Sequence, residues 1–127
     1  YRYKIWTRNM IISTYMDNCI FCKIVRGEIP SNKVFENDEF LAFLDIHPKA
    51  EGHTLLIPKA HYPWFIDVPD ELSDKLFRNA HKISKELKEK YRADYVRLGI
   101  VGTDVSHTHI HLIPLKLVSS KENLDTV

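Results

Sequence analysis

The clearest hydrophobic pattern along the chain lies in residues 70–91. Apolar residues recur there at steps of three and four positions, which places them on one stripe of a helix. These residues are Leu72, Leu76, Phe77, Ala80, Ile83 and Leu87. Pro69 and the acids Asp70 and Glu71 are typical of a helix start. The pattern predicts one long amphipathic helix over 70–91, with His81 as a partly exposed residue on it.

Shorter apolar and aromatic segments, separated by turn signals such as Asn37-Asp38, indicate strands. Strands are predicted at residues 33–36, 39–46, 53–58, 94–101 and 105–117. A short apolar segment at 19–26 predicts one or two helical turns, and 62–69 is expected to be a packed loop. Because the strands gather on either side of one long helix, the predicted fold class is α+β with an antiparallel sheet.

Length and composition are those of a single folded domain. The chain has 127 residues, of which 44% are hydrophobic. We expect a flexible N-terminal extension over 1–16, one domain over 17–118 and a polar C-terminal tail over 119–127. No stretch approaches the roughly 20 apolar residues of a membrane span. A soluble cytoplasmic protein is therefore expected.

The charges of the chain are nearly balanced, with 18 Lys and Arg against 17 Asp and Glu. Proteins that bind nucleic acids or anionic membranes in general carry a basic excess or stripe. The balance argues against both of these classes. An anionic ligand would have to be bound at a local site.

Three histidines alternate with other residues near the end of the chain, at His107, His109 and His111. In a strand, alternate side chains share one face, whereas Ile110 and Leu112 would point into a core. The group could be a metal tripod, accidental surface histidines or a reactive site. Neutral imidazole is a good nucleophile near neutral pH, and its neighbours can stabilise phosphate oxygens. This pattern favours His109 as a covalent nucleophile toward phosphorus.

The chain has two cysteines, Cys19 and Cys22. Two intervening residues are too few for a disulfide framework. The spacing suits a shared metal ion or a redox pair, and two small buried thiols are the alternative.

Three segments of the sequence, in the same order along the chain, resemble the histidine triad (HIT) family. The block HTHIHLI at 107–113 is similar to the family signature, and the stretches at 43–61 and 19–37 are similar to its middle and N-terminal segments. The resemblance covers about residues 19–117. It implies a HIT-like α+β fold with a five-stranded antiparallel sheet, one long helix and a short N-terminal helix, in a homodimer. It also implies reaction at the α-phosphate of a nucleotide through a nucleotidyl-histidine.

The resemblance assigns expected roles residue by residue. His109 is the nucleophile, His111 contacts phosphate oxygens, and His107 orients the site or binds metal. Asp45 binds the ribose hydroxyls, unless it only bonds nearby backbone. His53 lies near the triad at the nucleotide. An apolar base pocket, or alternatively ordinary core, is formed by Ile20, Phe21, Ile24, Phe43, Leu44 and Ile46.

A structural zinc site is implied by the same resemblance. Its four ligands would be Cys19, Cys22, His61 and His107, a Cys₂His₂ set that leaves no open position for a reacting water.

The segment before the triad, residues 98–106, departs from the family pattern. The Asn and the Gly-Gln pair that hold phosphate in many members are absent, and the loop is shorter. Backbone N–H groups around Gly102, or the hydroxyls of Thr103 and Ser106, are expected to replace them. Asp104 would repel the phosphate unless it points away or handles a proton.

The expected function is hydrolysis of a purine nucleoside phosphoramidate with release of AMP. The alternatives are a dinucleoside polyphosphate hydrolase, and a zinc-stabilised nucleotide-binding or protein-interaction module with little activity.

Overall fold

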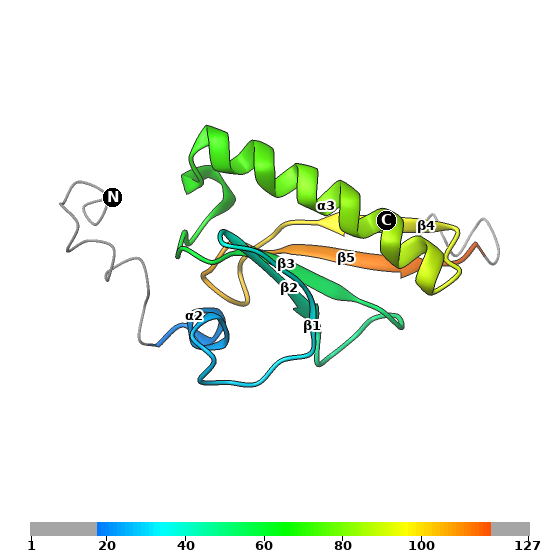
Figure 1. The fold of residues 1–127 in the computed structure, drawn as a ribbon, viewed down its shortest axis with the longest axis horizontal. Helices are drawn as coiled ribbons and strands as arrows, with labels where there is room; N and C mark the ends of the chain where they lie inside the picture. The colour runs from blue at the N-terminus through cyan, green and yellow to red at the C-terminus, as the bar shows by residue number, and fades with distance from the viewer. Residues whose placement is uncertain (1–17, 118–127) are drawn as a thin grey trace.

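The computed structural model describes residues 18–117, so the expected extension over 1–16 and the tail over 119–127 lie outside it. The elements in chain order are α2 (Ile20–Val25), β1 (Lys33–Glu36), β2 (Phe40–Leu44), β3 (Thr54–Pro58), the 3₁₀ turn η2 (Phe65–Asp67), α3 (Asp70–Lys90), β4 (Tyr95–Gly99) and β5 (Ile110–Leu115). The five strands form one antiparallel sheet in the order β1-β2-β3-β5-β4 (Figure 1). The predicted fold class is confirmed.

Helix α3 lies across one face of the sheet (Figure 1); it begins at Asp70, as predicted, and ends at Lys90, one residue before the predicted end. The stripe packs on side chains of β2, β3 and β5. Its buried members are Leu76, Ala80, Ile83 and Leu87. Phe77 lies at the margin of the stripe, 41% exposed, and contacts the ring of Phe65 edge-on. His81 is exposed, as expected.

Helix α2 packs against the opposite face of the sheet (Figure 1). Strand β2 therefore buries both of its sides: Phe40 and Ala42 face α3, whereas Leu41 and Phe43 face α2. Because both faces of the sheet are covered here, the sequences of β2 and β3 are almost continuously apolar, with little alternation of apolar and polar residues.

The fifth strand begins at Ile110, five residues later than predicted. Its pairing with β3 ends at Ile110 opposite Leu56. Upstream of that pair, the N–H and the hydroxyl of Thr108 both donate to the carbonyl of Tyr62, each over 2.7 Å. These hydrogen bonds to the loop that contains Tyr62 take the place of the β3–β5 backbone pairing. His107 and His109 therefore precede the regular strand. No helix within residues 18–117 is long and apolar enough to cross a bilayer.

Candidate active site

The proton of the His109 ring is assigned by a backbone carbonyl. Its Nδ1 lies 2.7 Å from the carbonyl oxygen of His107, and a carbonyl only accepts hydrogen bonds. Nδ1 therefore carries the proton in the neutral ring, and Nε2 carries a lone pair. His109 is 1% exposed, and within the described residues its Nε2 has no hydrogen-bond partner. A lone pair held in this way is available for nucleophilic attack.

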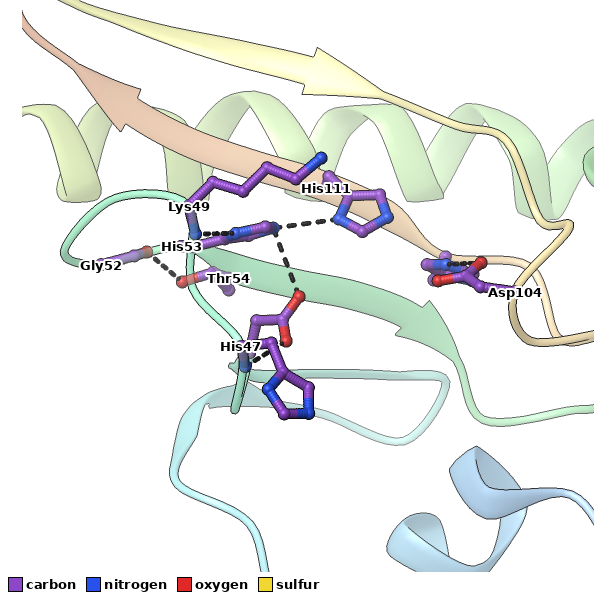
Figure 2. A network of polar contacts seen from close by, with 9 residues as sticks. His47, Lys49, Gly52, His53, Thr54, Asp104 and His111 are labelled. Carbon is purple, nitrogen blue, oxygen red and sulfur yellow. Dashed lines mark hydrogen bonds and ion pairs between the residues drawn. The ribbon is translucent and has the colours of Figure 1, made fainter.

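A chain of hydrogen bonds orients His111 beside it (Figure 2). The backbone N–H of Lys49 donates to Nδ1 of His53 over 3.0 Å, so the proton of His53 is on Nε2. That Nε2 donates to Nδ1 of His111 over 2.9 Å. The proton of neutral His111 is thereby left on Nε2, where it can be donated to a phosphate oxygen.

Burial keeps both members of this chain neutral. Burial lowers the pKa of His53, against the opposing charge of Asp45, whose Oδ2 lies 3.5 Å from Nε2 of His53. Burial also lowers the pKa of His111, and the neighbouring charge of His109 adds to that effect. Both shifts favour the neutral rings that the hydrogen bonds require.

The three triad histidines share one side of the sheet, although two of them precede β5. The ring of Phe21, from α2, contacts the edges of the His107 and His109 rings at centroid distances of 5.8 and 5.1 Å. The rings of His109 and His111 are 5.0 Å apart. Helix α2 therefore covers the histidines on the face expected from their alternation.

A pocket of about 330 Å³ is lined by Phe21, which contacts the rings of His107 and His109, and by Asp45, which approaches His53. All six residues expected in the base pocket line it, and Asp45 lines it too. The sequence analysis missed five further lining residues, which are Ile29, Pro30, Ser31, Asn32 and Leu55. Residues 29–32 form an irregular connection before β1 and have no periodicity that would have identified them.

Asp45 combines the two roles considered for it. Its Oδ1 accepts a hydrogen bond from the backbone N–H of His47 over 2.9 Å, so a local backbone bond exists. The same side chain lines the pocket and approaches His53 through Oδ2. The hydrogen bond to the His47 backbone holds the carboxylate in place, and the carboxylate still lines the pocket.

The four expected zinc ligands are buried together, on segments far apart in the sequence. Sγ of Cys19 lies 3.4 Å from Nδ1 of His107, and Sγ of Cys22 lies 3.3 Å from Nδ1 of His61. Tetrahedral zinc, at about 2.3 Å from sulfur and about 2.0 Å from nitrogen, holds such pairs roughly 3.6 Å apart. The donor set therefore fits zinc in both chemistry and spacing.

The protonation of these ligands also fits a cation. Nε2 of His107 donates to the carbonyl of Pro58 over 2.8 Å, which leaves the Nδ1 lone pair facing the sulfurs. The hydrogen bond with the Cys22 side chain, as the largest cause, holds the pKa of Cys19 well below its ordinary value of 9.0 against the opposing effect of burial. A thiolate is the form of cysteine that binds metal.

The short loop before the triad brings a carboxylate close to His109. Oδ1 of Asp104 lies 3.4 Å from Nε2 of His109, while Thr103 and Ser106 are exposed. Gly102 is buried with φ +97°, and a Cβ there would lie 3.4 Å from the Trp64 ring. Phosphate contacts by Gly102, Thr103 and Ser106 remain predictions.

Comparison with known proteins identifies the chain. The model of the HIT domain matches residues 26–117. The chain belongs to the HIT family. A HIT-like protein of Borreliella burgdorferi is 42% identical over 106 residues, which are 78% of this chain and 76% of that protein. A relative named adenosine 5′-monophosphoramidase HNT1, from Saccharomyces cerevisiae, is 44% identical over 97 residues, covering 76% of this chain and 61% of its own length.

Solved structures of HIT proteins share the fold. The crystal structure of a Zn-bound histidine triad family protein from Mycobacterium smegmatis has a TM-score of 0.76 and 32% identity, covering 81% of this chain and 78% of its own. Together with the named relatives, the family match makes the HIT protein described here a histidine triad nucleotide hydrolase.

Proposed function

We propose that this HIT protein hydrolyses a purine nucleoside phosphoramidate and releases AMP through a nucleotidyl-histidine at His109. One observation carries the proposal: Nε2 of His109 is buried and has no hydrogen-bond partner among the described residues, and the hydrogen bond from Nδ1 leaves the lone pair of the ring on this atom. The name of the yeast relative supports the choice of leaving group. The pocket would take the base and Asp45 the ribose hydroxyls, by a bidentate hydrogen bond.

The reaction has two displacements. In the first, the lone pair of Nε2 forms a bond to phosphorus, the P–N bond to the amine breaks, and the leaving nitrogen keeps the electron pair and takes a proton from water. In the second, a water oxygen forms a bond to phosphorus and gives up a proton to the solvent, the P–Nε2 bond breaks with its electron pair returning to His109, and AMP is released. His111 donates its Nε2–H to a phosphate oxygen in both steps. His53 acts through His111, because its Nδ1 accepts from the backbone of Lys49 and its Nε2 donates to His111.

The test is turnover of adenosine 5′-phosphoramidate by the wild type and by His109→Ala. The wild type is expected to release AMP, and a nucleotidyl adduct on His109 should be trapped by acid quench and mass spectrometry. His109→Ala should lose at least about a thousandfold in kcat/KM, because the covalent route is removed.

His81→Ala is the matched control, since His81 is an exposed histidine on α3, at the other face of the sheet. It should retain wild-type turnover. Equal activity of the His109 and His81 variants would refute the nucleophile assignment.

We also propose that Cys19, Cys22, His61 and His107 hold one structural zinc ion. With four protein ligands the ion would supply no activated water, and it would tie α2 to the loop before β5. Elemental analysis of the purified protein is expected to give one zinc per chain. Its absence from protein prepared without chelators would overturn this proposal.

A homodimer and a cytoplasmic location remain predictions. Light scattering on the purified protein should give twice the 14.9 kDa mass of one chain. A mass of one chain at micromolar concentration would refute the dimer.

A further inference from the structure

The rings of His53, His111 and His109 follow one another in a row, which we call the histidine row. Asp104 lies at one end of this row and Asp45 at the other. At one end, Oδ2 of Asp45 approaches His53, and at the other, Oδ1 of Asp104 approaches His109. Figure 2 shows His111 between the labelled His53 and Asp104. A nucleotide whose ribose is held at Asp45 and whose phosphorus is within reach of Nε2 of His109 would bring the substituents on phosphorus within a few ångströms of Asp104.

Space for a leaving group exists at that end. A second pocket, of about 470 Å³, is lined by Asp104, Ser106, Pro63 and His61 among others. Ile20 lines both pockets. Asp104 therefore lines a pocket of its own and also approaches Nε2 of His109, which puts its carboxylate within reach of a substituent on phosphorus.

Asp104 carries a negative charge there at neutral pH. Its side chain is 64% exposed. Partial burial raises its pKa, but hydrogen bonds from the backbone N–H groups of Asp104 and Val105, together with the charge of His109, hold the pKa of Asp104 below its ordinary value of 3.8. A carboxylate only accepts hydrogen bonds, so it favours N–H donors and repels anionic oxygens.

We propose that Asp104 selects the leaving group: it favours nucleotides that release an amine and disfavours those that release sulfate, phosphate or a nucleotide. The inference rests on the proposed function and specifies which leaving group that reaction accepts. As the P–N bond breaks, the leaving nitrogen holds its electron pair and a proton from water, and its N–H donates to Asp104. A leaving phosphate or sulfate would bring negative oxygens to the same carboxylate.

The experiment compares two substrates that share the adenylate part, adenosine 5′-phosphoramidate and adenosine 5′-phosphosulfate. The kcat/KM for the phosphoramidate divided by that for the phosphosulfate is measured for the wild type and for Asp104→Asn. This substitution keeps the shape of the side chain and removes its charge. The binding of the uncleavable analogue α,β-methylene adenosine diphosphate is measured in parallel. Asp74→Asn is the matched control, since it removes the same charge from the exposed part of α3.

The ratio should favour the phosphoramidate in the wild type and fall about tenfold or more in Asp104→Asn, as expected for a charge a few ångströms away. The methylene analogue should bind Asp104→Asn about tenfold more tightly. Asp74→Asn should change neither quantity. An unchanged ratio and unchanged analogue binding in Asp104→Asn, with the His109→Ala variant inactive, would overturn this inference alone. Activity independent of His109 would instead overturn the proposed function.

Discussion

Two backbone carbonyl groups assign the protons of neighbouring triad histidines in opposite ways. The carbonyl of His107 holds the proton of His109 on Nδ1, and the carbonyl of Pro58 holds the proton of His107 on Nε2. The lone pair of His109 therefore lies on Nε2, near Asp104, whereas that of His107 lies on Nδ1, facing the two thiols. Identical side chains two positions apart are thus prepared for different chemistry.

Loss of His53 should reduce turnover more than binding. His53→Ala removes the donor to Nδ1 of His111, so the proton of His111 is no longer held on Nε2. We expect kcat to fall about tenfold to a hundredfold, less than the loss of a direct oxyanion donor, with KM within about threefold. His53→Gln should recover part of the loss, because an amide can accept from Lys49 and donate to His111. Steady-state kinetics of the three proteins would test this, and a change confined to KM would contradict it.

Stability should decrease as the pH falls below about 6.5. Burial lowers the pKa of His53 and of His111 in the folded chain, whereas both regain their ordinary value of 6.5 when it unfolds. In this window the unfolded chain binds protons that the folded chain does not, which costs at most about 1.4 kcal/mol per pH unit for each histidine. Urea unfolding at pH 7.0 and 5.5 measures the loss. The loss should be smaller in His53→Gln, and equal losses would contradict the prediction.

At the scale of elements, one glycine allows the turn before β3 to lie against the end of α3. Gly52 has φ +89°, and a Cβ there would lie 2.6 Å from ring carbons of Tyr91 and 3.0 Å from Pro114. Both the backbone conformation and the close approach require glycine. The turn immediately precedes His53, so this packing also places the residue that orients His111.

Gly52→Ala should destabilise the protein more than Gly27→Ala. Gly27 has a similar φ of +80°, but a Cβ there would meet no atom within 4 Å. Gly27→Ala should cost about 1 kcal/mol from backbone strain alone. Gly52→Ala should cost a further 1–3 kcal/mol, roughly, from overpacking. Equal midpoints in urea unfolding of the two variants would refute the steric argument.

The elements also show where patterns along the chain stop being informative. The stripe from Leu72 to Leu87 predicted α3 correctly, because a 3.6-residue period belongs to the helix itself. The same reasoning placed the start of β5 at residue 105, although pairing begins at Ile110. The bonds from Thr108 to Tyr62 that end the ladder join positions 46 apart, and no local pattern contains them.

At the scale of the whole molecule, the four proposed zinc ligands come from three separate segments of the chain. Cys19 and Cys22 lie at the start of α2, His61 follows β3, and His107 precedes β5. An ion held by all four would fix α2, and with it Phe21, against the row of histidines. Metal binding would thereby be coupled to the order of the active site without entering the reaction.

Removal of zinc should therefore lower both stability and activity. We expect a strong chelator to lower the Tm by roughly 10 °C, since each kcal/mol lost lowers it by roughly 4 °C or more in a domain of this size. Cys22→Ser should show the lower Tm without chelator and no further change with it. Calorimetry with zinc added back measures the effect. A chelator effect of the same size on Cys22→Ser would show that these ligands are not the site.

By itself, the sequence determined the helix, the approximate strands, the shared face of His107, His109 and His111, and the family, because these depend on short periods and on ordered blocks of residues. The tertiary structure decided which nitrogen of each ring carries the proton, and that Asp104 and residues 29–32 approach the site. Those features depend on hydrogen bonds and contacts between distant segments, such as Pro58 with His107. His109 depends on both levels: the alternating pattern singles it out as the proposed nucleophile, and the hydrogen bond that folding provides to Nδ1 leaves its lone pair on Nε2.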